Sequence, residues 1–326
     1  MLQRTVQALF GLLLFFTSTY LNAQNSPDYG MYHKRVMAAE KLIIAENYQA
    51  ALHAYEQLFN NYDFIFLREY KIAVQLAWHL QDEQKTMAYL KKGILAGWEL
   101  KSIKKNKYLS KLGKGENWKT LKKEYPIHRK QYQSAINRPL RDQVKKMISR
   151  DQKKALRAFL TFGEKAKKKY AEKKFAPQSE KQIAEFSSIL KTHGYPGEKL
   201  IGNNFWMSTI ISHHNSISTE YGRKDQLYPT LKPLLKKALK KGEISPFEFA
   251  LIDDWYITVK NDRTEPAYGI LDAIAPEHLP KVNELRQAVF LRPVEVRNGL
   301  VDAQEKTGID FYLRGHTWGS GKIEIK

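Results

Sequence analysis

Apolar residues recur at helical spacing along most of this chain, and that periodicity constrains its fold more than any other feature. Between residues 38 and 59, for example, two apolar faces are separated by the short turn Glu46-Asn47-Tyr48. Residues three and four apart lie on one face of a helix, so this spacing predicts two packed helices. The pattern recurs over residues 66–97, 98–125, 139–162, 176–190, 206–221, 231–239, 245–259, 280–291 and 294–306. We therefore predict an all-α protein.

The first part of the chain resembles a short tetratricopeptide-repeat array. Asn47-Tyr48, Ala51, Tyr55 and Leu58 stand at the offsets where that family packs its second helix. A second unit follows over residues 66–97, with Met87 in the place of Ala51, and residues 98–125 resemble a closing unit. The resemblance implies helical hairpins that bury their faces against neighbouring repeats. It covers residues 29–125 of a predicted domain over residues 24–126.

The predicted boundaries of the second domain rest on proline and glycine. Pro126 is expected to end the first domain, residues 127–138 to form a linker or a bridging helix, and residues 139–326 to form a second helical domain. A turn is expected over residues 193–197. Ser245-Pro-Phe-Glu248 is typical of a helix start with a capping box. At the C-terminus, residues 311–313 and 323–325 are expected to pair as a small β-hairpin closed by Gly319-Ser-Gly321.

Residues 139–270 resemble a bacterial domain family of unknown function through the order of several polar and glycine motifs. These are Asp151-Gln152, Gly194-Tyr195-Pro196, Gly202, His213-His214, Gly242, Asp254 and Tyr268-Gly269. The chain departs from the family pattern at Tyr195, where the family has Trp, and at Trp255, where it has Arg. Ile270-Leu271 stand in place of Thr-Gln. The resemblance implies no particular activity.

The N-terminal residues form the pattern of a secretory signal peptide. Arg4 precedes a short apolar stretch over residues 8–16, and small residues lead to Ala23, after which cleavage is expected. The alternative is a buried N-terminal helix. The apolar stretch is too short to span a bilayer, which needs about 20 residues. The absence of cysteine excludes disulfides and a cysteine-linked lipid anchor. We expect an exported protein, periplasmic or secreted, that does not span the membrane after cleavage.

Almost all of the net charge of +20 lies in about a quarter of the chain. Between Lys101 and Lys174 there are 25 basic and 6 acidic residues. A field concentrated in this way attracts anions. The predicted binding residues are Lys104, Lys105, Lys145, Lys146, Arg150, Lys153, Lys154, Lys167, Lys168 and Lys169. Export disfavours nucleic acid as the partner and favours a protein or an anionic envelope component, either a lipid headgroup or an acidic glycan. The alternative is a solvated lysine-rich surface.

One histidine suggests a different class of function. His214 falls on the apolar face of the helix that contains Trp206 and Ile210, where a histidine can act as a base or form a hydrogen-bonded part of the core. Asp151 and Asp254 are its candidate partners in a hydrolase-like site. The main expectation is an exported binding or scaffold protein that uses the repeat surface and the adjoining basic residues, and the hydrolase is the alternative.

Motifs for metals and cofactors are weak in this sequence. There is no H-E-x-x-H pattern and no cysteine, and the adjacent His213 and His214 cannot both bind a metal from one helix face. The segment over residues 315–322 departs from a phosphate-binding loop in its spacing. It also has Ile323 where Ser or Thr is required. No metal and no cofactor are therefore expected.

Overall fold

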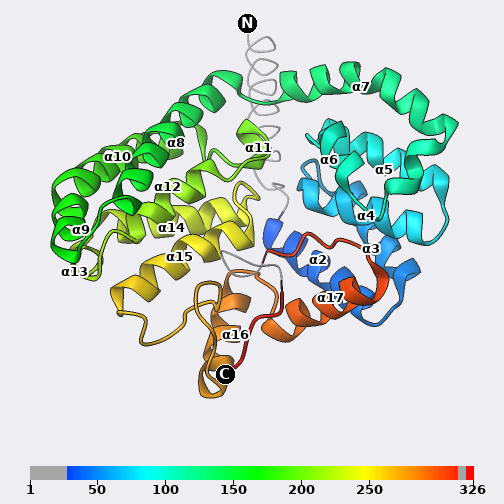
Figure 1. Ribbon diagram of the computed structural model, residues 1–326. Coiled ribbons are helices and arrows are strands. Elements are labelled where there is room, and N and C mark those ends of the chain that lie inside the picture. The colour runs from blue at the N-terminus through cyan, green and yellow to red at the C-terminus, as the bar shows by residue number, and fades with distance from the viewer. Residues whose placement is uncertain (1–27, 315–320) are drawn as a thin grey trace, which may run out of the picture.

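The computed structural model describes residues 28–314 and 321–326. The predicted signal peptide and its cleavage site after Ala23 lie outside these residues, as do Gly319 and Ser320 of the predicted hairpin. The described chain is built of helices, which confirms the all-α prediction (Figure 1). None of the helices in these ranges is both long enough and apolar enough to cross a membrane.

The N-terminal module consists of two helical hairpins followed by a closing segment. Its helices are α2 (Tyr29–Ile44), α3 (Tyr48–Asn61), α4 (Leu67–His79), α5 (Glu83–Leu95), α6 (Leu100–Lys105), the short 3-10 helix η1 (Ser110–Lys114) and α7 (Glu116–Ala135). Asn47 and Asp82 cap α3 and α5 by accepting backbone N–H groups at 3.2 and 2.9 Å. Each cap satisfies a donor that the first helical turn leaves open, so the predicted turns sit at defined helix starts.

Helix α7 passes through Pro126, so the bridging helix expected over residues 127–138 begins before this proline and not after it. A proline inside a helix removes one hydrogen bond and strains the preceding turn. Here the helix continues because apolar contacts hold it on both sides. Trp118 and Leu121 are buried before the proline, and Tyr132 is buried after it. Most of the predicted linker over residues 127–138 is therefore helical, and α7 bridges to the second module (Figure 1).

The second module packs around a separate apolar core. Its helices are α8 (Arg138–Phe159), α9 (Glu164–Tyr170), the π-helical turn η2 (Ala171–Phe175), α10 (Ala176–His193), α11 (Glu198–Ile201), α12 (Trp206–Asn215), α13 (Thr219–Lys224), α14 (Leu227–Lys240) and α15 (Pro246–Lys260). Phe186, Ile210 and Phe249 are fully buried at its centre. The capping box predicted at Ser245 and Glu248 is present at the start of α15, which confirms that helix start.

The last part of the chain returns to the first module. After η3 (Pro276–His278) and α16 (Leu279–Ala288), helix α17 (Val294–Thr307) lies beside α2 (Figure 1). Leu300, Ile309 and Phe311 are fully buried in the N-terminal core. The segment predicted as the end of a second domain thus completes the core of the first, and the chain closes on itself around the centre of the molecule.

The predicted C-terminal hairpin does not form between residues 311–313 and 323–325. Ile325 instead makes a parallel bridge with Ile274, in which the Ile274 N–H donates to the Glu324 carbonyl at 3.0 Å. The reason is packing, because Ile323 is buried with Ile274 and Val282 in a small satellite core. Phe311 is buried elsewhere, in the N-terminal core, so the two segments are held by different parts of the molecule.

Candidate functional site

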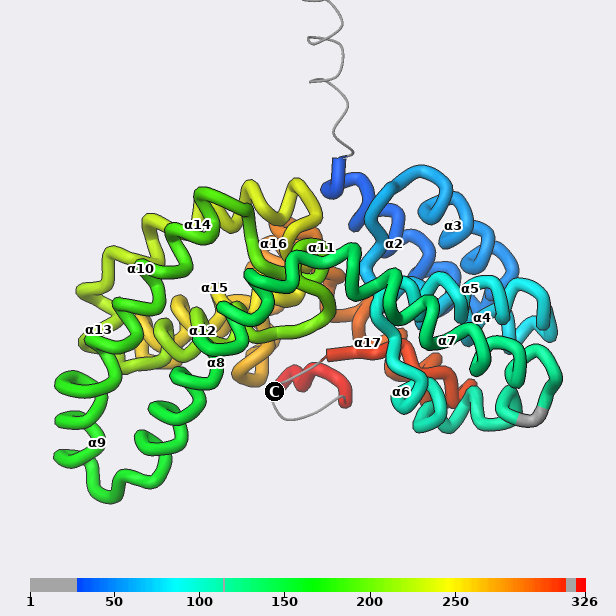
Figure 2. The backbone as a smooth tube through the Cα atoms, turned by 90° about the horizontal axis from the view of Figure 1, so that it is seen from above, coloured from blue at the N-terminus to red at the C-terminus, as the bar shows by residue number. Residues whose placement is uncertain are grey.

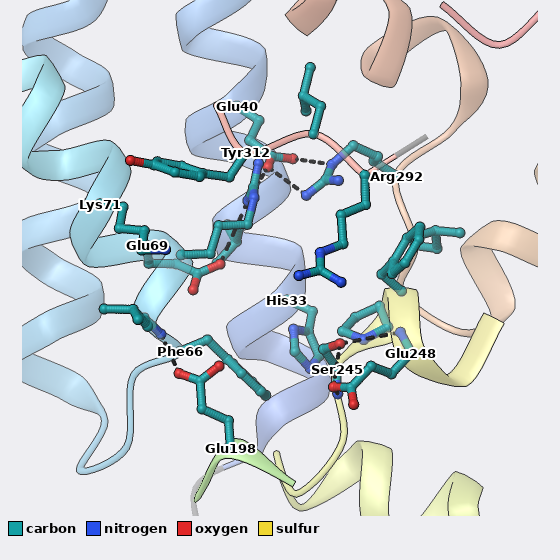
Figure 3. Close-up of a pocket in the computed structure, with 18 of the residues that line it drawn as sticks. His33, Glu40, Phe66, Glu69, Lys71, Glu198, Ser245, Glu248, Arg292 and Tyr312 are labelled. Carbon is teal, nitrogen blue, oxygen red and sulfur yellow. Dashed lines mark hydrogen bonds and ion pairs between the residues drawn. The ribbon is translucent and has the colours of Figure 1, made fainter. Parts of the chain in front are cut away.

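A cavity of about 570 Å³ lies where the two modules and the C-terminal segment meet (Figure 3). The N-terminal module contributes His33, Glu40, Phe66, Arg68, Glu69 and Lys71, the second module contributes Glu198, Phe205, Ser245, Phe247 and Glu248, and the C-terminal part contributes Phe290, Arg292, Gln304, Asp310, Tyr312 and Arg314. Ligand pockets typically enclose about 300–1,000 Å³, so this cavity has the size of a small-molecule site.

A glycine-rich turn brings Glu198 into the cavity. Helix α10 ends at His193, and Gly194 follows with a φ of +84°, a conformation that glycine adopts without steric cost. The predicted turn over residues 193–197 is thereby confirmed, and α11 begins directly after it with Glu198. The backbone N–H of Leu67 donates to Glu198 Oε1 at 2.5 Å. This bond links the second module to the start of α4 in the first.

The capping box of α15 places a second carboxyl at the cavity. The Glu248 N–H donates to Ser245 Oγ at 3.2 Å, and the Ser245 hydroxyl lies 3.0 Å from Glu248 Oε2. These bonds fix both side chains at the helix start, where the open N–H groups favour polar partners. The sequence motif that marks a helix start therefore also supplies part of the cavity wall.

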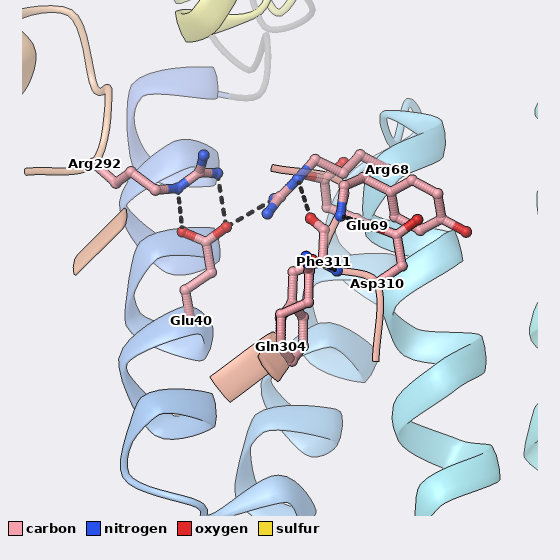
Figure 4. Close-up of polar contacts among 8 residues, drawn as sticks. Glu40, Arg68, Glu69, Arg292, Gln304, Asp310 and Phe311 are labelled. Carbon is pink, nitrogen blue, oxygen red and sulfur yellow. Dashed lines mark hydrogen bonds and ion pairs between the residues drawn. The ribbon is translucent and has the colours of Figure 1, made fainter. Parts of the chain in front are cut away.

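Opposite these residues, one buried carboxylate holds two arginines (Figure 4). Glu40 is 1% exposed and accepts from Arg292 Nε at 2.8 Å and from Arg292 Nη2 at 2.7 Å. Arg68 Nη1 lies 2.7 Å from Glu40 Oε1. Burial alone would raise the pKa of Glu40, but the two guanidinium groups hold it below its usual value. Glu40 therefore stays ionised and fixes both arginines at the cavity wall.

Several buried polar atoms at the cavity have no hydrogen-bond partner within the described part of the chain. They are His33 Nε2, Glu69 Oε2 and Arg68 Nη2. Unpaired buried polar atoms are costly, about 1–3 kcal/mol each. Such groups are uncommon in a folded protein unless water or a ligand pairs with them. Three residues with such atoms line this one cavity, where a polar ligand would pair with them.

The carboxyl groups around the cavity have perturbed pKa values. Burial raises the pKa of Glu69 to about 7, of Glu198 to about 8 and of Glu248 to about 7. Burial also lowers the pKa of His33 to about 3 and lowers that of Lys71. At neutral pH much of the carboxyl population is therefore protonated, and protonated carboxyl groups both donate and accept hydrogen bonds.

Aromatic rings and cations alternate on the remaining wall. Lys71 Nζ lies 4.6 Å from the centre of the Tyr312 ring, and the Arg314 guanidinium lies 3.3 Å from that of Phe205. The Lys71 ammonium makes no hydrogen bond within the described residues, so its donors remain available to a ligand. Flat apolar faces beside charged groups suit a ligand that carries both a ring and an anionic group.

Each residue proposed for a hydrolase-like site has a partner other than the one proposed. Asp151 contacts His213, with 2.6 Å between Oδ2 and Nδ1. Asp254 accepts backbone N–H groups from Tyr268, Ile270 and Leu271. His214 is fully buried and contacts Ser179 Oγ at 3.0 Å and Asp225 Oδ1 at 3.4 Å. The sequence analysis did not identify Asp225, and none of these residues lines the cavity.

The predicted basic residues fall into two separate groups. Lys104 and Lys105 are exposed on α6 in the first module, whereas the others lie on α8 and α9 in the second module (Figure 1). The second group consists of Lys145, Lys146, Arg150, Lys153, Lys154, Lys167, Lys168 and Lys169. The structure therefore does not bring all ten residues into one patch.

Among residues 28–314 and 321–326, no group of three or more histidine, aspartate or glutamate side chains has the arrangement of a metal site.

Comparison with protein-family models, with curated proteins and with solved structures found no match.

Proposed function

We propose that this chain is an exported binding protein that holds a compact, hydroxyl-rich anion, typified by an acidic sugar, in the cavity between its modules. The observation that carries this proposal is the cluster of buried, unpaired polar atoms at His33, Arg68 and Glu69, which all line one cavity of ligand size. An acidic glycan, which was expected from the sequence, is thus still the proposed class of partner. Its proposed site is the interior cavity and not the basic surface.

The charge balance of the cavity favours an anionic ligand. Four cationic side chains line it: Arg68, Lys71, Arg292 and Arg314. On the acidic side, Glu40 stays ionised and Asp310 also lines the cavity, so two acidic side chains face the four cations. Burial raises the pKa values of the other carboxyl groups, at 69, 198 and 248, to about 7 or 8. Because these groups carry only part of a charge at neutral pH, the cations are not fully compensated. A carboxylate on the ligand would supply the missing charge through charge-assisted hydrogen bonds.

The remaining groups favour hydroxyls and a ring. Ser245 and Gln304 are neutral groups on the cavity wall, and protonated carboxyl groups add donors to them. Phe205, Phe247 and Tyr312 also line the cavity and supply apolar surface for the ring of a sugar. Ser245 already pairs with Glu248, and Gln304 Oε1 accepts from the Phe311 N–H at 3.1 Å. The hydroxyls of a compact ring would therefore pair mainly with the atoms at His33, Arg68 and Glu69 that have no partner within the described residues.

Calorimetric titration of the mature chain with glucuronate and digalacturonate, compared with glucose, tests this proposal. We expect saturable binding of at least one acidic sugar and none of glucose at the same concentration. Replacing Lys71 by Met removes an available cation while keeping the length of the side chain. It should weaken binding about tenfold, in line with a charge-assisted hydrogen bond.

The matched control is Lys34→Met, which removes an exposed lysine from α2 outside the cavity and should leave the affinity unchanged. If glucose binds as tightly as the acidic sugars, or if Lys34→Met and Lys71→Met have equal effects, the proposed ligand class or its location is wrong.

A further inference from the structure

A second feature, far from the cavity, is a projecting helical hairpin with an apolar tip. The buried residues of α8 (Leu140, Val144, Met147 and Asp151) all lie in its first two thirds, and α9 has none. In Figure 2 the end of α8 and the start of α9 extend beyond the body of the second module. The chain reverses at Gly163, which has a φ of +82° and no atom within 4 Å of the position of a Cβ.

The tip exposes large apolar side chains. Phe159 is 82% exposed, Phe162 is 86% exposed, and Leu156 and Leu160 are 59% and 57% exposed. These four are among the nine large apolar residues that are exposed in the described chain, and they fall within seven consecutive positions. Leu156, Phe159 and Leu160 have the three- and four-residue spacing of a single helix face. Scattered apolar side chains are normal on a protein surface, whereas such a cluster marks an interaction site.

Basic residues surround this apolar tip. Residues 150–174 include ten lysines and arginines and three acidic residues, and one of these, Asp151, is buried against His213. Arg150 pairs with Glu185 and Lys168 with Glu220. The other basic side chains of this segment make no ion pair in the described part of the chain: Lys153, Lys154, Arg157, Lys165, Lys167, Lys169, Lys173 and Lys174. The positive charge around the tip is therefore largely uncompensated.

We propose that this tip, residues 153–174, docks on an anionic phospholipid bilayer. A bilayer surface accommodates both parts of the tip, because phenylalanine and leucine enter the boundary between headgroups and acyl chains while lysines remain near the charged headgroups. Nucleic acid would match the lysines and could stack on phenylalanine, but it offers no apolar environment for Leu156 and Leu160. This inference does not depend on the ligand of the cavity.

Co-sedimentation of the mature chain with vesicles tests the proposal. We expect binding to vesicles of equal parts phosphatidylglycerol and phosphatidylcholine and little binding to phosphatidylcholine alone. Binding should weaken as salt rises above about 0.1 M, because surface charges are then screened. Phe159→Ser combined with Phe162→Ser should lower the vesicle partition coefficient at least about tenfold. Ile127→Ser, which changes an exposed residue on α7, should not lower it.

A charge-matched pair of triple variants separates the tip from the other basic surface. Lys165→Gln with Lys167→Gln and Lys169→Gln should reduce vesicle binding about tenfold or more, since each lysine near an anionic bilayer contributes substantially to binding. Lys101→Gln with Lys104→Gln and Lys105→Gln removes the same charge from α6 and should have little effect. Equal losses from the two triples would overturn the proposal, because binding would then follow net charge alone.

Insertion itself can be observed because the chain contains no cysteine. An environment-sensitive nitrobenzoxadiazole dye on Leu160→Cys should brighten on addition of the anionic vesicles, whereas the same dye on Ile127→Cys should not. If the fluorescence of the dye on Leu160→Cys does not change with vesicles but rises with protein concentration, the tip contacts a second copy of the chain instead, and the proposal is wrong. Failure of the wild-type chain to bind the anionic vesicles would likewise overturn the proposal.

Discussion

The cavity and the tip both contain many charged residues, but these residues differ in their burial and in their pairing. At the cavity, the buried Glu40 carboxylate lies between Arg68 and Arg292, and these three charges are paired within the fold. At the tip, Phe159 and Phe162 are exposed, and most of the surrounding lysines are exposed and make no ion pair within the described chain. Paired buried charge builds a shaped site for one molecule, whereas unpaired exposed charge acts over a surface. From this difference we infer that the cavity recognises a small ligand and that the tip attaches the protein to a membrane surface.

The largest effect should come from breaking the buried charge network. Glu40→Gln leaves the partly buried Arg68 and Arg292 without their carboxylate, and it should lower the free energy of unfolding by about 3 kcal/mol. Urea denaturation followed by circular dichroism measures this. The matched control, Glu116→Gln, removes an exposed partner of Lys119 and should cost less than about 0.5 kcal/mol. Similar losses in the two variants would mean that the cavity charges are no more coupled to the fold than surface charges.

The next effect depends on pH. Burial raises the pKa of Glu198 to about 8 in the folded protein, above the usual value of about 4.3 for an unfolded chain. Folding therefore becomes less favourable as pH rises from about 4 to 8, because the unfolded state releases this proton first. Glu198→Gln replaces the ionisable carboxyl group by an amide. The amide oxygen can still accept the hydrogen bond from the Leu67 N–H. The substitution should stabilise the protein by about 1–3 kcal/mol at about pH 8.5, with little change at about pH 5.

Thermal unfolding of Glu198→Gln and the wild-type chain across this pH range checks that expectation. Glu277→Gln, at an exposed carboxyl, is the control and should leave the pH dependence unaltered. A stabilisation by Glu198→Gln that is the same at both ends of the range would contradict the raised pKa.

The smallest effect on stability is expected at the tip. Phe159→Ser combined with Phe162→Ser removes two large apolar side chains that are mostly in solvent, so the free energy of unfolding should change by less than about 0.5 kcal/mol. Denaturation of this variant beside the wild-type chain measures the change. A loss of more than about 2 kcal/mol, in the range seen for large-to-small changes in a core, would mean that the tip is part of the folded core and not a free surface.

The sequence predicted the helices and the lysine-rich segment because both are local properties. The cavity was missed because its residues are scattered from His33 to Arg314 and meet only when α17 returns to α2. One signal was available. Glu40 and Glu69 both fall on the buried faces of their helices, and a carboxylate at such a position requires a partner. The identity of that partner depends on tertiary packing, as does the pairing of His214 with Asp225 in place of Asp151 or Asp254.

The most direct test of two separate sites is one calorimetric titration of digalacturonate into two variants side by side. With Lys71→Met the affinity should fall about tenfold, as for any lost charge-assisted hydrogen bond. With Phe159→Ser combined with Phe162→Ser at the tip, the affinity for digalacturonate should equal the affinity of the wild-type chain. Undiminished binding by Lys71→Met together with lost binding by the tip variant would contradict the account, because the sugar would then bind at the surface and not in the cavity.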